Sequence, residues 1–335
     1  MMHAVQYTYP GSLKYTANAL LQPSADEVLI KVAFSGICGT DLHIIAGEAP
    51  SAKQIILGHE FSGIVAEIGD NVTNLNPGDA VSVNPNDFCG QCPACKQGSM
   101  HFCQEMKPIG ISKNGGWAEY CSAPVSQVHK LPDDVPREWG ALCEPLSCIV
   151  HGWDRLQPLV NHSSVLILGS GLIGLLWALT LRQYGFQDIL ISEPLNQRRI
   201  IADKLNFSSV VPEKIADIVV KHNNGFDVII DCSGNAQAIE AGFAHINPLG
   251  KFLLFGICPP THMINISPFQ IFQKELSILG SVINPDTFSR AVELIGQIAR
   301  PLEDLGVTFY PLPEYEGALR SAREGKFSKV IFRID

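Results

Sequence analysis

One short stretch of the chain, DFCGQCPACKQGSMHFC, contains four cysteines, namely Cys89, Cys92, Cys95 and Cys103. Four thiolates fill the tetrahedral shell of a zinc ion and leave no position for water or substrate, so such a zinc holds a loop together and does no chemistry. An iron–sulfur cluster is the rival, but its ferredoxin motif places the fourth cysteine three residues on, whereas here seven residues intervene. We therefore predict a structural zinc in a lobe at about 87–105, with the chemistry elsewhere.

A second set of metal-binding residue types is spread over three other segments, GICGTDLH, ILGHEFSG and LCEPLSCIVHG, and consists of Cys38, His59, Glu60 and Glu144. A catalytic zinc needs about three protein ligands of mixed sulfur, nitrogen and oxygen type plus one open position. Taken singly, each residue has an ordinary interpretation as a buried thiol, a loop histidine or a surface carboxylate. Together with the dinucleotide motif described next, the four predict a metal site open to substrate.

The dinucleotide motif lies in VLILGSGLIG, residues 165–174. A short apolar strand leads into Gly169, Gly171 and Gly174, which have the G-x-G-x-x-G spacing, and a helix follows. The first glycine permits the tight turn, the second lets the backbone approach a pyrophosphate, and the third packs helix against strand. The helix N-terminus, with Leu172 and Ile173 in its first turn, faces the phosphates. The strand before and the helix after supply the context that three glycines alone lack.

Glu193 ends the next predicted strand, DILISE, 19 residues beyond Gly174. An acidic side chain there accepts hydrogen bonds from the adenosine ribose and repels a 2′-phosphate, which favours NAD over NADP. Arg198 and Arg199 follow closely and weaken this preference, because an arginine can pair with that phosphate or stack on adenine. We predict NAD as the cofactor, with Glu193 and Arg198 beside its adenosine half.

The secondary-structure elements that must position these residues follow two different sequence patterns. Up to about Pro136 the chain is rich in Gly and Pro, with short strand-like runs such as Glu27–Phe34 and Ser62–Val72, as in a compact β-rich domain. From about Val165, apolar strands alternate with helical stretches, which is typical of a doubly wound parallel sheet. A strand at Leu276–Ser281, a helix from about Thr287 and a strand-like tail, SKVIFRID, complete the pattern.

Length, charge and cysteine use limit the class of protein. With 335 residues the chain has room for two domains with separate cores. A net charge of −9 argues against nucleic-acid or acidic-membrane partners, since either requires a basic face. We find neither an apolar run of the roughly 20 residues that a membrane span needs nor a signal peptide, so we expect a cytoplasmic protein. In that reducing compartment the ten cysteines are thiolate ligands and core residues rather than disulfides.

Taken in chain order, these motifs resemble those of the zinc-dependent medium-chain dehydrogenases, closest to the sorbitol and polyol branch with a structural zinc lobe. The resemblance covers nearly the whole chain and is carried by Cys38 with Thr40-Asp41-x-His43, Gly58-His59-Glu60, the four-cysteine lobe, Glu144-Pro145-Leu146-Ser147 and the glycine turn. It implies an α/β protein in which a β-rich, GroES-like catalytic domain (1–146) is interrupted by a Rossmann domain (147–284), with residues 285–335 returning to the catalytic domain. It also implies two zinc ions per chain.

The resemblance also assigns roles. Cys38 and His59 match catalytic zinc ligands, Glu60 matches a carboxylate that binds or approaches the metal, and Glu144 takes the place of a cysteine ligand in simple alcohol dehydrogenases. Cys143, one residue earlier, is the alternative. Asp41 would hold the second ring nitrogen of His59 and fix its tautomer.

Thr40 and His43 would relay the hydroxyl proton by way of the nicotinamide ribose to solvent, while the substrate carbon transfers hydride to NAD. The implied reaction is oxidation of a secondary alcohol to a ketone.

EPLS points to a polyol or sugar-alcohol substrate, with butanediol, threonine or simple alcohols as alternatives. Sorbitol dehydrogenases that resemble this chain usually place an arginine and an aromatic near the end of the Rossmann domain, and here GSVINPDTF (280–288) lacks both at the corresponding places. A catalytically silent family member and a zinc-stapled interaction module are less favoured, the latter because its basic surface is missing. By analogy with the family we expect a homodimer or homotetramer, joined in part through the predicted edge strand Leu276–Ser281.

Overall fold

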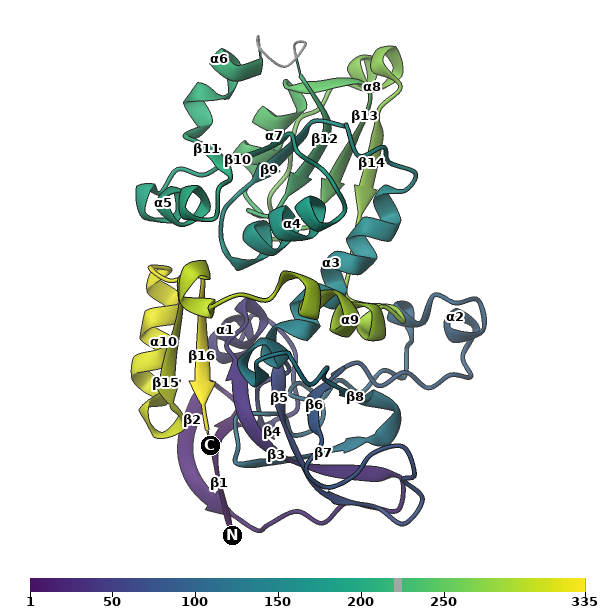
Figure 1. The fold of residues 1–335 in the computed structure, drawn as a ribbon, viewed down its shortest axis with the longest axis vertical. Coiled ribbons are helices and arrows are strands. Elements are labelled where there is room, and N and C mark those ends of the chain that lie inside the picture. The colour runs from purple at the N-terminus through teal and green to yellow at the C-terminus, as the bar shows by residue number, and fades with distance from the viewer. Residues whose placement is uncertain (220–224, 335) are drawn as a thin grey trace. The chain divides into compact units, whose positions relative to one another are not determined.

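The computed structural model describes residues 1–219 and 225–334 and divides the chain into two compact units (Figure 1). Unit 1 comprises Met1–Ser147, Asn284–Glu303 and Val307–Asp335, and unit 2 comprises Cys148–Ile283 with Asp304–Gly306. The two main boundaries lie one residue from the predicted ones, and Asp304–Gly306 departs from the predicted scheme. The first boundary falls inside a helix, α3 (Cys143–Leu156), so the chain leaves unit 1 without a linker.

Unit 1 is built on a seven-stranded, largely antiparallel sheet. Its strands, in sheet order, are β15 (Val307–Pro311), β16 (Lys329–Arg333), β3 (Glu27–Gly36), β5 (Phe61–Ile68), β6 (Ala80–Val83) and β8 (Val128–Lys130), with β7 (Tyr120–Pro124) paired to β3. The C-terminal strand β16 pairs with β3, so the last segment of the chain completes the sheet begun by the first. The strand predicted at Glu27–Phe34 is confirmed as β3, and that predicted at Ser62–Val72 as β5.

A second, three-stranded sheet of unit 1 has the order β2 (Ser12–Asn18), β1 (Met2–Thr8), β4 (Gln54–Ile56). The helices of this unit are α1 (Gly39–Ala46), α2 (Pro93–Lys96), α9 (Phe288–Ile298), α10 (Tyr315–Glu324) and the start of α3. One core cluster centres on Trp117, whose ring packs edge-on against Phe332 with centroids 5.3 Å apart. Because Trp117 and Phe332 come from distant parts of the sequence, this core joins the N-terminal and C-terminal segments of the unit.

Unit 2 contains a six-stranded parallel sheet with the order β11-β10-β9-β12-β13-β14. Its strands are β9 (Val165–Leu168), β10 (Ile189–Ser192), β11 (Ser208–Val210), β12 (Phe226–Asp231), β13 (Ile246–Leu254) and β14 (Ser277–Gly280). Numbered within the sheet, this is the order 3-2-1-4-5-6 of dinucleotide-binding folds. The chain therefore leaves β9 in one direction and returns to β12 on its other side, and ligands bind where the carboxyl ends of those two strands diverge.

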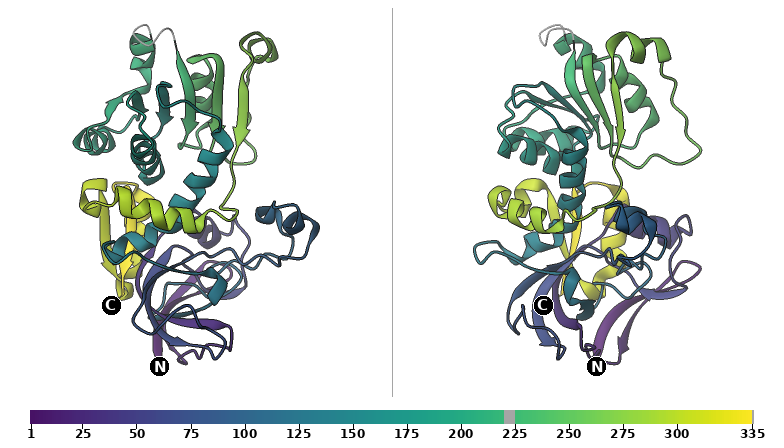
Figure 2. Two further views of the ribbon diagram at one scale, coloured as in Figure 1. Left: turned by 45° about the vertical axis from the view of Figure 1, so that its right-hand side comes forward. Right: turned by 90° about the vertical axis from the view of Figure 1, so that its right-hand side faces the viewer.

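Helices lie on both faces of this parallel sheet (Figure 2). They are α4 (Leu172–Gln183), α5 (Asn196–Lys204), α6 (Ile215–Val219), α7 (Ala236–Phe243) and α8 (Pro268–Lys274). All four residues of β9 are buried, as expected for a central strand covered on both sides. The predicted fold class, a GroES-like β domain with an inserted Rossmann domain, is confirmed. Among the described residues, no helix has both the length and the hydropathy that crossing a bilayer requires.

Candidate functional site

The mixed ligand set converges in unit 1, where the ends of β3 and β5 meet. Cys38 precedes α1 directly, and His59 and Glu60 immediately precede β5, which pairs with β3. One ligand atom from each of Cys38, His59 and Glu60 lies within 4.8 Å of the other two. Gly58 makes the turn before them with a φ of 92°, and a side chain there would collide with the Trp117 ring. The local sequence GHE therefore places two candidate ligands, His59 and Glu60, beside the third, Cys38.

Asp41 holds two of these residues together. It is fully buried in the first turn of α1, and its Oδ2 accepts the backbone N–H of Cys38 at 2.8 Å, while its Oδ1 lies 3.4 Å from His59 Nδ1. Burial by itself would lower the pKa of His59, but the charge of Asp41 and then that of Cys38 raise it well above its usual value. The cluster therefore favours a positive charge at His59, which either a proton or a bound metal ion provides.

Lys329 is a residue of this site that the sequence reasoning missed. It lies on β16, is almost fully buried, and forms an ion pair with Glu60 Oε2. Burial alone would lower the pKa of the ammonium, but Glu60 and then Cys38 raise it. Gly36 leaves the space that the Glu60 carboxylate fills, since an added Cβ would collide with it. The one available signal was a lysine in the otherwise apolar tail SKVIF.

The remaining predicted residues of this centre lie in two places. Glu144 is buried in the first turn of α3, where its carbonyl accepts the Ser147 hydroxyl at 2.6 Å, and in the described chain its carboxylate is not part of the close-packed group. Burial raises the pKa of Cys143 to about 12, against a lowering by the Ser82 hydroxyl, and within the described residues its sulfur is likewise outside the close-packed group. Thr40 Oγ1 lies 3.8 Å from Cys38 Sγ, and His43 Nδ1 lies 2.6 Å from Glu48 Oε2.

The four cysteines of the lobe also form a close group, with their sulfur atoms all within 4.8 Å of one another. Cys89 Sγ lies 3.5 Å from Cys103 Sγ and 4.0 Å from Cys95 Sγ, and no cysteine of the chain is disulfide-bonded. Tetrahedral zinc with bonds of about 2.3 Å places its sulfur ligands about 3.8 Å apart, so these spacings fit the metal. The backbone N–H of Cys95, and after it the thiols of the three neighbouring cysteines, lower the pKa of Cys92 to about 6 in spite of burial, which favours its thiolate form.

The predicted dinucleotide motif occupies the turn between β9 and α4 in unit 2. Gly169 has a φ of 103°, a conformation that side chains disfavour, and a Cβ on Gly174 would overlap the carbonyl oxygen of Gly169. Gly171 differs, since the nearest atom to an added Cβ would be Arg198 Nη1 at 3.9 Å. Leu172 and Ile173 open α4, and their backbone N–H groups are among those that a helix start leaves without a partner in the helix. The glycines at 169 and 174 are thus needed by the turn itself, whereas Gly171 leaves open space.

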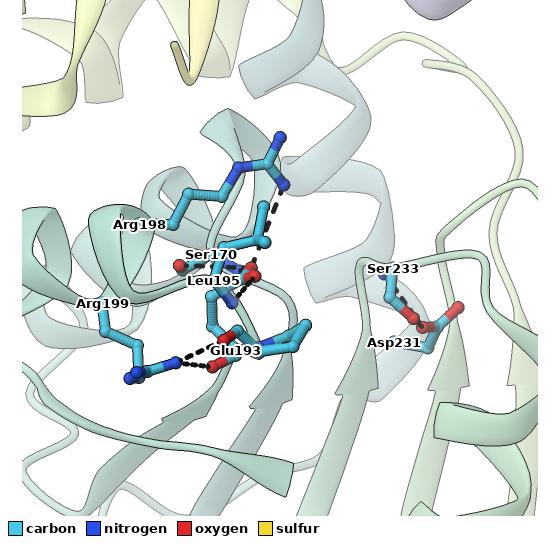
Figure 3. Close-up of polar contacts among 8 residues, drawn as sticks. Ser170, Glu193, Leu195, Arg198, Arg199, Asp231 and Ser233 are labelled. Carbon is cyan, nitrogen blue, oxygen red and sulfur yellow. Dashed lines mark hydrogen bonds and ion pairs between the residues drawn. The ribbon is translucent and has the colours of Figure 1, made fainter. Parts of the chain in front are cut away.

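Glu193, directly after β10, faces this glycine turn (Figure 3). Its side chain is only 3% exposed, and its two oxygens accept the backbone N–H groups of Ser170 and Leu195, each at 2.9 Å. Arg198 Nη1 lies 4.0 Å from the same carboxylate. Arg199 is used differently: it donates to the backbone carbonyls of Glu193 and Pro194, both at 2.7 Å. Of the two arginines, only Arg198 contacts the Glu193 carboxylate in the contacts shown in Figure 3.

Asp231, which sequence reasoning also missed, ends β12, the neighbour of β9 (Figure 3). Its carboxylate is fully buried and accepts the Ser233 N–H at 2.9 Å and the Ser233 hydroxyl at 2.6 Å, while the Gly234 N–H lies 3.3 Å away. Burial raises its pKa above the usual value in spite of these donors. Asp231 therefore fixes the conformation of the loop that follows β12, at the place where the chain connections from β9 and β12 diverge. Its sequence signal was a polar run, DCSGN, directly after a buried strand.

Comparison with known proteins identifies the family to which both parts of the chain are similar. Residues 24–133 match the family described as alcohol dehydrogenase GroES-like domain, and residues 173–297 match the family described as zinc-binding dehydrogenase. The L-threonine 3-dehydrogenase of Pyrococcus horikoshii is 33% identical over 99% of both chains. The D-arabitol-phosphate dehydrogenase of Enterococcus avium is also 33% identical, over 98% of this chain and 97% of that protein.

A solved structure shows the same fold over the full length. It is a Sinorhizobium meliloti protein assigned as a zinc-binding dehydrogenase and bound to NADP, with a TM-score of 0.93, 33% identity and 99% of each chain covered. Both units of the present chain therefore have counterparts in one known architecture.

Proposed function

Because the chain belongs to the zinc-dependent medium-chain dehydrogenase family, in its polyol branch, we propose that it oxidises a secondary hydroxyl of a sugar alcohol or other polyol to the ketone, with NAD as hydride acceptor. Alcohol oxidoreduction follows from the family. The polyol and the cofactor are the proposal. The observation that carries it is the convergence of a thiolate, an imidazole and a carboxylate, Cys38, His59 and Glu60, within 4.8 Å in a partly buried cluster.

This donor set suits a catalytic zinc, which takes mixed sulfur, nitrogen and oxygen ligands and keeps one position open. When bound, zinc would stabilise negative charge on the substrate oxygen, and the nicotinamide would accept the hydride. Asp41 would hold His59 Nδ1 and so present its other ring nitrogen to the metal. We propose that Glu144 joins Cys38, His59 and Glu60 as a ligand. Its burial in unit 1, at the start of α3, supports this assignment.

Two residues of α1 would move the alcohol proton. Thr40 follows Cys38 by two positions, and its hydroxyl, 3.8 Å from the Cys38 sulfur, would take the proton of the substrate hydroxyl. His43 lies three residues further, which is nearly one helical turn, and would pass that proton to solvent, since its side chain is 54% exposed. General acid–base transfer of this kind is worth about 10²- to 10⁴-fold in rate.

The adenosine side supports NAD. The Glu193 carboxylate lies against the glycine turn, where its charge would repel a 2′-phosphate and its oxygens could exchange backbone donors for ribose hydroxyls. Arg198, 4.0 Å away, partly offsets that charge. Because the Sinorhizobium meliloti protein binds NADP, the preference needs a direct comparison of the two cofactors.

The test is NADH formation by the zinc-loaded protein across sugar alcohols, diols, threonine and simple alcohols, repeated with NADP. Turnover confined to sugar alcohols supports the proposal, and preference for another class overturns the polyol assignment while keeping the chemistry. Cys38→Ser should abolish turnover and leave NADH binding intact. The matched control is Cys258→Ser, a half-buried thiol of unit 2 outside both cysteine groups, which should keep full activity.

Threonine is the second candidate, because a relative identical at 33% over the full length is named for it. The segment 280–288 adds an observation. The Asn284 amide donates to Ser147 Oγ at 2.6 Å, and Thr287 Oγ1 donates to the Ser147 carbonyl at 2.7 Å. These polar groups are used by the fold instead of being offered to substrate hydroxyls, so the polyol would have to be held elsewhere. A kcat/KM for threonine above that for every polyol would decide for this candidate.

We also propose a cytoplasmic homodimer or homotetramer. The ten free cysteines suit a reducing compartment. Within the described residues of unit 2, β14 is the last strand of the sheet and pairs on one side only, and Ile278 and Val282 in and just after it are exposed. An edge of this kind is a template for pairing with a second copy. Light scattering coupled to size exclusion should give two or four chains per particle, and Ile278→Lys should reduce that number.

A further inference from the structure

We propose that Glu48 is a positioning residue of the proton relay, holding His43 in the one tautomer that can accept the alcohol proton. This inference rests on the proposed function, since it concerns the relay of the same reaction. It is carried by a 2.6 Å contact between His43 Nδ1 and Glu48 Oε2, in a segment whose backbone places the two side chains together.

The C-terminus of α1 builds this pair. Gly47 has a φ of 78°, its N–H donates to the Ile44 carbonyl at 3.0 Å, and the N–H of Glu48 donates to the His43 carbonyl at 2.9 Å. These two bonds are those of a Schellman motif, which ends a helix at a left-handed glycine and folds the next residue back over the last turn. The backbone turn formed by the sequence HIIAGE therefore places Glu48 next to His43 independently of the contact between their side chains.

The contact with Glu48 decides which ring nitrogen of neutral His43 carries no hydrogen and can accept a proton. A carboxylate only accepts hydrogen bonds, so Nδ1 must carry the hydrogen in the pair. In the neutral ring the lone pair is then on Nε2, which is the atom available to take a proton. As in metal sites, where a carboxylate fixes the tautomer of a ligating histidine, the glutamate here would select the reactive nitrogen of the relay histidine.

The proton balance of the step is simple. The substrate O–H bond would break, its proton would pass by way of the Thr40 hydroxyl and the nicotinamide ribose to Nε2, and the imidazolium that forms would lie beside the Glu48 carboxylate. The ring would then release one proton to water and return to the neutral form, and NAD, when bound, would accept the hydride. Both side chains are open to solvent, at 54% and 64% exposure, so the last transfer needs no further protein group. Tyr9 and Lys53 are the other titratable residues lining the cavity of about 290 Å³ beside Glu48.

A direct test reads the tautomer of His43 by ¹⁵N NMR of the imidazole ring in the full-length protein. Wild type should show hydrogen on Nδ1, and Glu48→Ala should lose that preference. The chain offers a matched control: His3 Nδ1 lies 3.3 Å from Glu119 Oε1, also at an exposed site. Glu119→Ala should alter the His3 signals and leave those of His43 unchanged. An unchanged His43 tautomer in Glu48→Ala overturns the proposal.

Kinetics supply the second readout. Glu48→Ala should lower kcat about two- to fivefold, a size set by an exposed pair, and change both KM values less than twofold. In a His43→Gln background the same change should have no further effect, because Glu48 acts through His43. Additive losses in the double variant, or wild-type kcat in Glu48→Ala, would contradict the inference. Glu119→Ala should keep wild-type turnover.

The experiments distinguish failure of the proposed function from failure of the role proposed for Glu48. If wild type oxidises no alcohol, the proposed function falls and the relay role of Glu48 falls with it. If wild type oxidises an alcohol and His43→Gln is as active as wild type, the relay assignment falls while the dehydrogenase remains. If only the Glu48 variants behave as wild type, the positioning role alone is wrong.

Discussion

Gly171→Ala should separate cofactor binding from folding in the glycine turn. At this position an added Cβ would have Arg198 Nη1 as its nearest neighbour, at the ordinary contact distance of 3.9 Å, and φ is −65°, which any residue adopts. The protein alone therefore tolerates alanine. If the pyrophosphate approaches the backbone here, the methyl group occupies its path.

The expected effects of Gly171→Ala on stability and on cofactor affinity differ from those of Gly174→Ala. Alanine in place of glycine at the start of a helix changes the free energy of unfolding by less than about 1 kcal/mol, which is a shift of a few degrees in Tm. A ligand displaced by about 1 Å loses one to two orders of magnitude in affinity, or about 1.4 to 2.8 kcal/mol. In Gly174→Ala the new Cβ would be only 2.0 Å from the Gly169 carbonyl oxygen, so at least 1 Å of movement is forced on the turn itself. Such overpacking costs about 1–3 kcal/mol of stability.

The assay is titration of each purified variant with NADH, followed by fluorescence or calorimetry, together with thermal unfolding of the cofactor-free protein. Gly171→Ala should bind NADH at least tenfold more weakly and unfold within a few degrees of wild type, whereas Gly174→Ala should lose both affinity and stability. Wild-type affinity in Gly171→Ala would refute the placement of the pyrophosphate, and a Gly171→Ala protein as unstable as Gly174→Ala would refute the account of the open space.

Three further predictions concern other parts of the chain. Cys103→Ser should remove one of the two metal groups, lowering bound zinc by one ion per chain and the Tm by several degrees; unchanged zinc content by elemental analysis would contradict a lobe site. Glu193→Ala should raise the ratio of kcat/KM for NADP to that for NAD at least about tenfold, and an unchanged ratio would remove this residue from cofactor choice. Burial would raise the pKa of Asp227, but donors from Asn247 and Ser164 hold it below its usual value, so its stabilisation is present above about pH 4 and is lost as the pH falls further. Asp227→Asn should therefore flatten the fall of Tm between about pH 4 and 3, and parallel curves for the two proteins would count against that role.

The parts of the site that could be predicted from sequence are those encoded locally. The glycine turn needs only a strand, three glycines and a helix within ten residues, and the structure has all three in place. The four cysteines lie close in sequence, and their sulfur atoms meet. Cys38, His59 and Glu60 lie in two short segments next to paired strands, and they also converge. In each case the sequence separation is small or is bridged by one strand pair.

The parts that could not be predicted depend on long-range packing. Lys329 reaches Glu60 only because β16 pairs with β3, and a lysine in a C-terminal tail gives no sign of its partner. Asp231 and Gly169 come together because β12 lies beside β9. The sequence shows that the expected arginine and aromatic are missing at the corresponding places in residues 280–288, but it does not show that Asn284 and Thr287 hydrogen-bond Ser147.

The sequence by itself indicated candidate zinc ligands and a candidate dinucleotide turn, because ligand type and turn geometry are properties of a few adjacent residues. The tertiary structure alone decided which charges surround them. Lys329 is the clearest case, because its charge lies beside Glu60 only through the pairing of β16 with β3. Coulomb interactions weaken with the distance between two charges and strengthen with their burial. Both the distance and the burial are set only when the chain has folded.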